Sequence, residues 1–150
     1  MPAFGPSALV VAVTLLSVAA AVMVHYEGLT ALGRRFGVGR ERPSRRKVLK
    51  MIVGLLGLHV LEIWLFGIAY WGLMHVDGTG DIAGVNEISL FDSVYLSAIT
   101  FTTVGFGDLA PVGPIRFLSG SQALTGLLLI TWSASFTYLE MSRHWREDGQ

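Results

Sequence analysis

The stretch that decides the fold is residues 89–111, which read SLFDSVYLSAITFTTVGFGDLAP. Ser89 is followed three positions later by Asp92, and this capping-box pattern before an apolar run predicts a helix that begins at Leu90. The run predicts that the helix ends near Phe101. Roughly 12 residues at 1.5 Å per residue extend about 18 Å, about half of a membrane. The helix is therefore too short to span a bilayer.

A glycine-rich segment follows the helix, Thr102-Thr103-Val104-Gly105-Phe106-Gly107-Asp108. Two glycines separated by one residue permit backbone conformations that are closed to residues with a Cβ. The carbonyl groups of consecutive residues can then point to one side, and a ring of such carbonyls can replace the hydration shell of a potassium ion. Within a membrane, non-helical backbone is tolerated only where it is buried in protein or lines a watery cavity.

The composition of the whole chain is that of a membrane protein. Hydrophobic residues make up 52% of the 150 residues, charged residues make up 15%, and the mean hydropathy is +0.57. Typical soluble domains have about 25% charged residues, so this chain has too little polar surface to stay dissolved. The formal net charge of +0 argues against a nucleic-acid partner, which requires a basic excess. The absence of cysteine excludes disulfide scaffolds and thiol catalysis.

Three further apolar stretches, roughly residues 7–26, 51–74 and 117–141, are long enough to span a bilayer, which takes about 20 residues. The first could instead be a secretory signal peptide, but residues 1–6 lack the basic start of such a peptide. We therefore predict an all-α integral membrane protein with three transmembrane helices and a re-entrant helix before the third.

The distribution of charge predicts the orientation in the membrane. Basic residues crowd residues 34–50, and acidic residues dominate residues 75–116. Because basic loops stay in the cytoplasm, we expect the N-terminus outside and the C-terminus inside a multi-pass protein of the cell membrane. Attraction of residues 34–50 to anionic lipid is a second interpretation of their charge. Residues 75–89, rich in glycine and without apolar periodicity, are expected to form an exposed loop.

In this setting Thr100-Phe101-Thr102-Thr103-Val104-Gly105-Phe106-Gly107-Asp108 resembles the selectivity filter of the tetrameric potassium channels. That family has a threonine, two residues, a second threonine, a hydrophobic residue and then Gly-Tyr-Gly-Asp. The resemblance continues through Leu109-Ala110-Pro111. It implies a pore domain with an outer helix, a pore helix, a filter and an inner helix. The predicted segments are an N-terminal transmembrane helix (1–33), a basic cytoplasmic linker (34–50), the pore domain (51–142) and a short cytoplasmic tail (143–150).

The resemblance also implies which residues bind the ion. It assigns the potassium-binding filter to Thr103, Val104, Gly105, Phe106 and Gly107. Support of the filter is assigned to Thr100, Tyr95 and Asp108, with a hydrogen bond between Tyr95 and Asp108. Rings of four oxygens need four chains, so the resemblance implies a homotetramer around a central pore. No cofactor is expected besides the permeating potassium ion.

The sequence departs from the family at Phe106, where most members have tyrosine. The coordinating carbonyl belongs to the backbone and is kept, but the hydroxyl that bonds to the surrounding pore helices in the family is missing. We therefore expect a filter that is less firmly braced and more prone to inactivation.

The third apolar stretch carries polar or small residues at steps of four, seven and four, which places them close to one helix face: Gln122, Gly126, Ser133 and Thr137. Such a stripe suits a water-filled pore, and it also suits helix packing, which uses the same small residues. Gly126 lies near the hinge glycine of the family's inner helix, so a gating hinge at Gly126 is a hypothesis.

The second apolar stretch contains two ionisable residues, His59 and Glu62, three positions apart on one helix face. Ionisable groups inside a membrane are costly and indicate function by default. The pair has two interpretations, a proton sensor coupled to gating and a neutral hydrogen-bonded pair that ties helices together. His25, His75 and His144 are expected at the membrane edges, without a spacing that indicates a metal site.

These observations predict a channel that passes potassium down its electrochemical gradient. The alternatives are a weakly selective cation channel and a non-conducting membrane subunit that regulates a transporter. An enzyme is not expected, because the sequence offers no paired carboxylates, activated nucleophile or cofactor loop.

Overall fold

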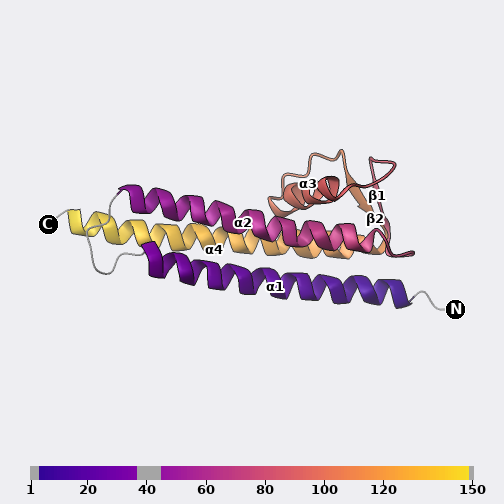
Figure 1. Ribbon diagram of the computed structural model, residues 1–150, viewed down its shortest axis with the longest axis horizontal. Coiled ribbons are helices and arrows are strands. Elements are labelled where there is room, and N and C mark those ends of the chain that lie inside the picture. Colours follow the sequence, from indigo (N-terminus) through magenta and orange to yellow (C-terminus); the bar gives the residue numbers. More distant parts are fainter. Residues whose placement is uncertain (1–3, 37–44, 149–150) are drawn as a thin grey trace.

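The computed structural model describes residues 4–36 and 45–148. The elements are the helices α1 (Phe4–Phe36) and α2 (Arg45–Leu73), the strand β1 (Asp81–Ala83), the helix α3 (Leu90–Phe101), the strand β2 (Ala110–Val112), a 3-10 turn (Gly113–Ile115) and the helix α4 (Arg116–Asp148). The three long helices lie side by side, and α3 with the two strands lies against one end of them (Figure 1).

The core forms where α3 packs against both α2 and α4. The residues buried there include Phe66 and Tyr70 of α2, Leu96 and Phe101 of α3, and Leu118 of α4. The helix α1 packs on the other side, against α2 and α4. Its Gly28 receives the side chain of Leu58, which leaves no space for a Cβ, and small residues at such contacts let membrane helices approach closely.

The long helices extend further than the sequence predicts. Since α1 runs to Phe36, Arg34 and Arg35 form its last turn, and since α2 begins at Arg45, residues 45–50 are helical too. The helices therefore extend into the predicted basic linker over 34–50 from both of its ends, and residues 37–44 lie outside the described residues. Arginine and lysine are good helix formers, and basic side chains in a last turn interact favourably with the helix dipole. The predicted tail 143–150 is likewise helical as far as Asp148.

Two of the described helices are long and apolar enough to cross a membrane, Gly5–Phe36 and Arg45–Leu73. The third predicted span, α4, is 33 residues long. It is more polar than the other two, since charged residues lie toward both of its ends and polar residues lie among its apolar ones. Of the polar residues, Gln122, Thr125 and Ser133 are buried within the chain.

Residues 75–89 are mostly exposed, as expected, but they also contain a strand and two buried side chains. Strand β1 pairs antiparallel with β2, with Ile82 opposite Pro111, and Ile82 is buried. Thr79 is buried as well, and its carbonyl accepts a hydrogen bond from the Ile115 amide at 2.9 Å. Two strands of three residues are too short to produce a periodic pattern, so the sequence gives no signal for this pairing. The two-stranded sheet is a small addition to a chain that is mostly helical, as the expected all-α class requires.

Candidate functional site

The helix α3 has the bounds and the cap that the sequence predicts. The Asp92 amide donates to the Ser89 hydroxyl oxygen at 3.1 Å, and the Ser89 amide donates to the Asp92 carboxylate at 3.0 Å. This reciprocal capping box satisfies two backbone donors at the start of the helix. The hydrogen bonds from Ser89 hold the pKa of the Asp92 carboxyl below its usual value.

The segment after α3 has an alternating backbone. Thr103, Gly105 and Gly107 have positive φ values of 58°, 51° and 84°. Among the described residues, Thr103 is the one non-glycine with a positive φ, a conformation that such residues rarely adopt. When the handedness of successive residues alternates, their peptide groups align on one side of the chain.

The start of this segment is bonded to the end of α3. The Thr103 amide donates to the Thr100 carbonyl at 3.0 Å, and the Gly105 amide donates to the Ile99 carbonyl at 3.1 Å. Beyond these bonds the segment is open, since Val104 is 55% exposed and Phe106 is 71% exposed. One chain by itself therefore leaves the segment uncovered.

A side-chain contact joins the two ends of the region. The Tyr95 hydroxyl donates to the Asp108 carboxylate at 2.8 Å, so the predicted hydrogen bond between these two residues is present. The bond raises the pKa of Tyr95, because the neutral phenol is the form that donates. The contact links the first half of α3 to the residue that follows Gly107.

The four residues of the predicted stripe on α4 have two different surroundings. Gln122 donates to the carbonyl and the hydroxyl oxygen of Ser97 at 3.1 and 2.6 Å, and a Cβ on Gly126 would collide with the Phe101 carbonyl. Both residues therefore pack against α3, as in the helix-packing interpretation. Ser133 and Thr137 instead line a groove between α2 and α4.

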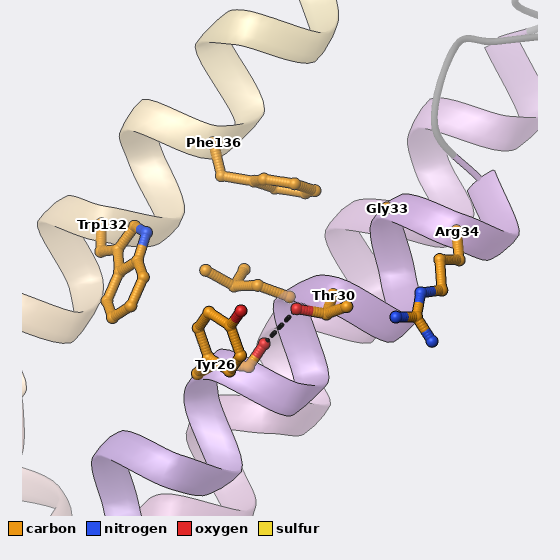
Figure 2. Close-up of a pocket in the computed structure, with 7 residues that line it drawn as sticks. Tyr26, Thr30, Gly33, Arg34, Trp132 and Phe136 are labelled. Carbon is orange, nitrogen blue, oxygen red and sulfur yellow. Dashed lines mark hydrogen bonds between the residues drawn. The ribbon is translucent and has the colours of Figure 1, made fainter.

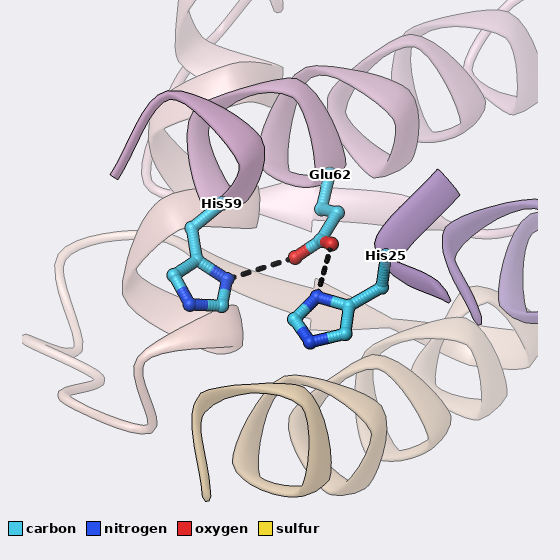
Figure 3. A group of neighbouring side chains, drawn as sticks. All are labelled: His25, His59 and Glu62. Atoms are coloured by element: carbon cyan, nitrogen blue, oxygen red, sulfur yellow. Dashed lines mark hydrogen bonds and ion pairs between the residues drawn. The ribbon is translucent and has the colours of Figure 1, made fainter. Parts of the chain in front are cut away.

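The predicted pair of His59 and Glu62 is joined by a hydrogen bond of 2.9 Å, and the structure adds a third member. His25 of α1 lies 2.7 Å from the other carboxylate oxygen of Glu62, and both residues are fully buried (Figure 3). The expectation that His25 lies at a membrane edge is wrong. The apolar stretch was taken to end near residue 26, whereas the helix continues to Phe36, which leaves His25 well inside it.

This polar cluster, His25, His59 and Glu62, contacts the other helices through aromatic rings. The His25 and Trp132 ring centroids are 5.3 Å apart, and those of His59 and Phe101 are 5.8 Å apart. The cluster thus touches α4 and the last residue of α3. His75 lies apart, with its Nδ1 2.7 Å from the Trp71 carbonyl, and the side chain of His144 is outside the described residues.

A second groove lies between α1 and α4 (Figure 2). Its volume is about 420 Å³, and it is lined by Tyr26, Leu29, Thr30, Gly33, Arg34, Trp132 and Phe136. Arg34 is the charged residue of this lining, so the groove combines a largely apolar and aromatic wall with one cation.

Comparison with known proteins identifies the class. A family model described as an ion channel matches residues 58–141, more than half of the chain. The chain therefore belongs to this ion channel family, which confirms the resemblance that the filter-like motif carries, and it is a membrane protein.

Individual relatives match over shorter lengths. The inward rectifier potassium channel Kirbac3.1 of Paramagnetospirillum magnetotacticum is 31% identical over 90 residues, which cover 59% of this chain and 29% of that protein. Protein LctB of Geobacillus stearothermophilus is 42% identical over 48 residues, 31% of this chain and 36% of that protein. The chain thus spans about a third of the length of these relatives. No solved structure matches.

Proposed function

We propose that the chain forms a homotetrameric, potassium-selective channel that conducts passively across the cell membrane. The observation that carries this proposal is the alternation of positive φ at Thr103, Gly105 and Gly107, directly after a short apolar helix. This backbone suits a column of carbonyl oxygens, which is the chemistry of a potassium filter. The name of one relative, an inward rectifier potassium channel, supports the same ion.

Within the proposed filter, Thr103, Val104, Gly105 and Phe106 supply carbonyl oxygens, and the Thr103 hydroxyl supplies the innermost ring. Gly107 allows the positive φ at the end of the filter. Thr100, Tyr95 and Asp108 support the segment. A single chain contributes one strand of oxygens, whereas the ion requires rings of four. The open face of the segment, with Phe106 71% exposed, supports a site that is completed by neighbouring copies.

The proposed topology has three membrane spans, α1, α2 and α4, with the N-terminus outside and the C-terminus in the cytoplasm. The basic residues near the junction of α1 and α2 support this orientation. The apolar side chains exposed on α4, such as Leu124, Leu127 and Leu128, suit contact with lipid or with other copies of the chain. Arg34 and its neighbours would face anionic lipid on the cytoplasmic side.

A flux assay in liposomes tests the proposal. The wild-type chain is expected to pass potassium and to exclude sodium. Gly105→Ala should abolish selective flux, since φ at this position is 51° and a Cβ is disfavoured there. Gly57→Ala is the matched control, because a Cβ at Gly57 meets no other atom within 4 Å and φ there is not positive.

The alternatives give different results in the same assay. A reversal potential that does not move when sodium replaces potassium would indicate a weakly selective cation channel. Absence of any flux from correctly assembled protein would favour a non-conducting regulatory subunit. Equal potassium flux in wild type and Gly105→Ala would contradict the assignment of the filter.

A further inference from the structure

The polar cluster contains a buried carboxylate, Glu62, whose ion-pair partners among the described residues include no lysine or arginine. Within the part of the chain that the structure describes, the ion-pair partners of Glu62 are His25 and His59. The Glu62 carboxylate is fully buried between apolar helices and is paired with imidazoles, not with the permanent cation of a lysine or arginine. Isolated charge in such surroundings is costly. The cluster therefore favours the uptake of a cation.

The donor atoms of the cluster suit a divalent transition metal. One ligand atom from each of His25, His59 and Glu62 can be chosen so that all three lie within 4.8 Å of one another. Two imidazole nitrogens and one carboxylate oxygen form a recognised ligand set for zinc, with the fourth position left to water. Metal–nitrogen distances of about 2.0–2.1 Å place tetrahedral ligand atoms about 3.3 Å apart. Small side-chain rotations would close the remaining distance.

One imidazole nitrogen of the cluster has no hydrogen-bond partner. The Nε2 atom of His25 is buried and has no hydrogen-bond partner, which is unusual for a polar atom inside a protein. In Figure 3 the two imidazoles approach Glu62 from their Nδ1 sides, and the α4 helix passes beside them. The two imidazole rings are stacked with their centroids 5.5 Å apart, so their nitrogen atoms lie close to one another beside the carboxylate.

A route to the cluster runs along the groove between α2 and α4. His59 lines this groove together with Ser133 and Thr137, and its volume is about 530 Å³. The groove follows α2 from His59 back to Ile52, toward the end of the molecule where α2 begins. The Ser133 hydroxyl, on the wall of the same groove, is buried without a hydrogen-bond partner and is therefore a polar group that an entering ion or water can contact.

We propose that His25, His59 and Glu62 bind one divalent metal ion of the zinc class per chain. The ion supplies the positive charge that the buried carboxylate lacks, and because its ligands come from both helices it ties α1 to α2. His59 packs against Phe101, the last residue of α3. The bound ion therefore lies near the end of the helix from which the proposed filter starts.

Cobalt(II) is the probe, since it occupies zinc sites and absorbs visible light when its coordination is tetrahedral. The full chain, purified in detergent and stripped of metal with a chelator, is titrated with cobalt(II). We expect visible bands that saturate at one ion per chain and disappear when zinc is added. Glu62→Gln and His59→Gln should weaken binding at least tenfold. His75→Gln is the matched control and should leave the titration unchanged, because His75 lies outside the cluster.

Two outcomes overturn the proposal. One is the absence of saturable cobalt(II) bands in the wild-type chain, which would leave the cluster as a hydrogen-bonded tie between helices. The other is an unchanged titration in folded Glu62→Gln. Helix content and oligomer size are measured for each variant, and if Glu62→Gln does not fold, the partly exposed His59 supplies the deciding variant. The readout is metal binding, so its failure says nothing against potassium conduction.

Discussion

Gly126 of α4 packs against the backbone carbonyl of Phe101, the last residue of α3, so closely that no Cβ fits between them. One turn earlier on α4, Gln122 donates two hydrogen bonds to Ser97 of α3. Ser97 in turn donates to the Ile63 carbonyl of α2 at 2.7 Å. The end of α3, from which the proposed filter starts, is therefore held by both of its long neighbours.

The first prediction concerns Gly126→Ala. Alanine in a helix interior stabilises by about 1 kcal/mol relative to glycine. The collision with Phe101 acts in the opposite direction, and overpacking of this kind costs about 1–3 kcal/mol. We expect a net loss of thermal stability in detergent, together with reduced potassium flux.

The control for this variant is Gly57→Ala, which makes the same chemical change on α2 without a neighbour within 4 Å. It should be as stable as wild type or slightly more so. If Gly126→Ala alters channel opening while its stability equals or exceeds that of wild type, the hinge hypothesis is supported and the packing explanation fails.

The second prediction concerns Tyr95→Phe, which removes the hydroxyl that donates to Asp108. Because this hydrogen bond is exposed to solvent, it contributes little to the free energy of unfolding. We expect little change in global stability but faster loss of potassium current during sustained opening. Asp108→Asn should have a similar effect, and the double variant should add little to either. Additive effects of the two substitutions would show that the hydrogen bond is not what supports the filter.

The third prediction concerns Phe106→Tyr, which restores the hydroxyl that the family's filter has at this position. We expect slower inactivation with unchanged selectivity, because the backbone carbonyl is the same in both variants. Single-channel recordings of both proteins under identical potassium gradients make the comparison. Inactivation and conductance that match those of wild type would refute the idea that Phe106 weakens the bracing.

The fourth prediction concerns the pH dependence of stability through Asp92. Its pKa is lowered in the folded chain by Ser89, so its contribution is present above the ordinary value of 3.8 and is lost as the pH falls through the lower, folded value. The thermal midpoint of wild type in detergent should therefore drop as the pH is lowered below 3.8. Asp92→Asn should show a smaller drop, and so should Ser89→Ala, which removes the hydroxyl donor and keeps the backbone amide donor. If the thermal midpoints of both variants fall with pH as steeply as that of wild type, this pH dependence does not come from Asp92.

Much of the candidate site follows from local sequence. The bounds of α3, its capping box and the position of the glycine-rich segment depend on residues within a few positions of one another. Tyr95 and Asp108 could be paired because the family resemblance aligns both of them. In each of these cases the information lies within residues 89–111, so no knowledge of distant packing was needed.

Other features depend on contacts between distant parts of the chain. His25 and Glu62 are 37 positions apart, and nothing in the pattern around either residue indicates the other. The face of α4 that carries Gln122 and Gly126 suits a pore or a packed interface equally well by its periodicity. In the structure α3 lies beside α4, and Gln122 and Gly126 both contact it, so these two residues belong to a packed interface.

The sequence by itself therefore determined the short helix, its cap, the ion-channel motif and the apolar helices around it, since these depend on local propensity and hydrophobic pattern. Only the tertiary structure decided the pairing of β1 with β2, the true ends of α1 and α2, and the joining of His25 to His59 and Glu62. The physical reason is that burial and hydrogen bonding between helices depend on which faces meet, and the pattern of a single helix does not specify its partner.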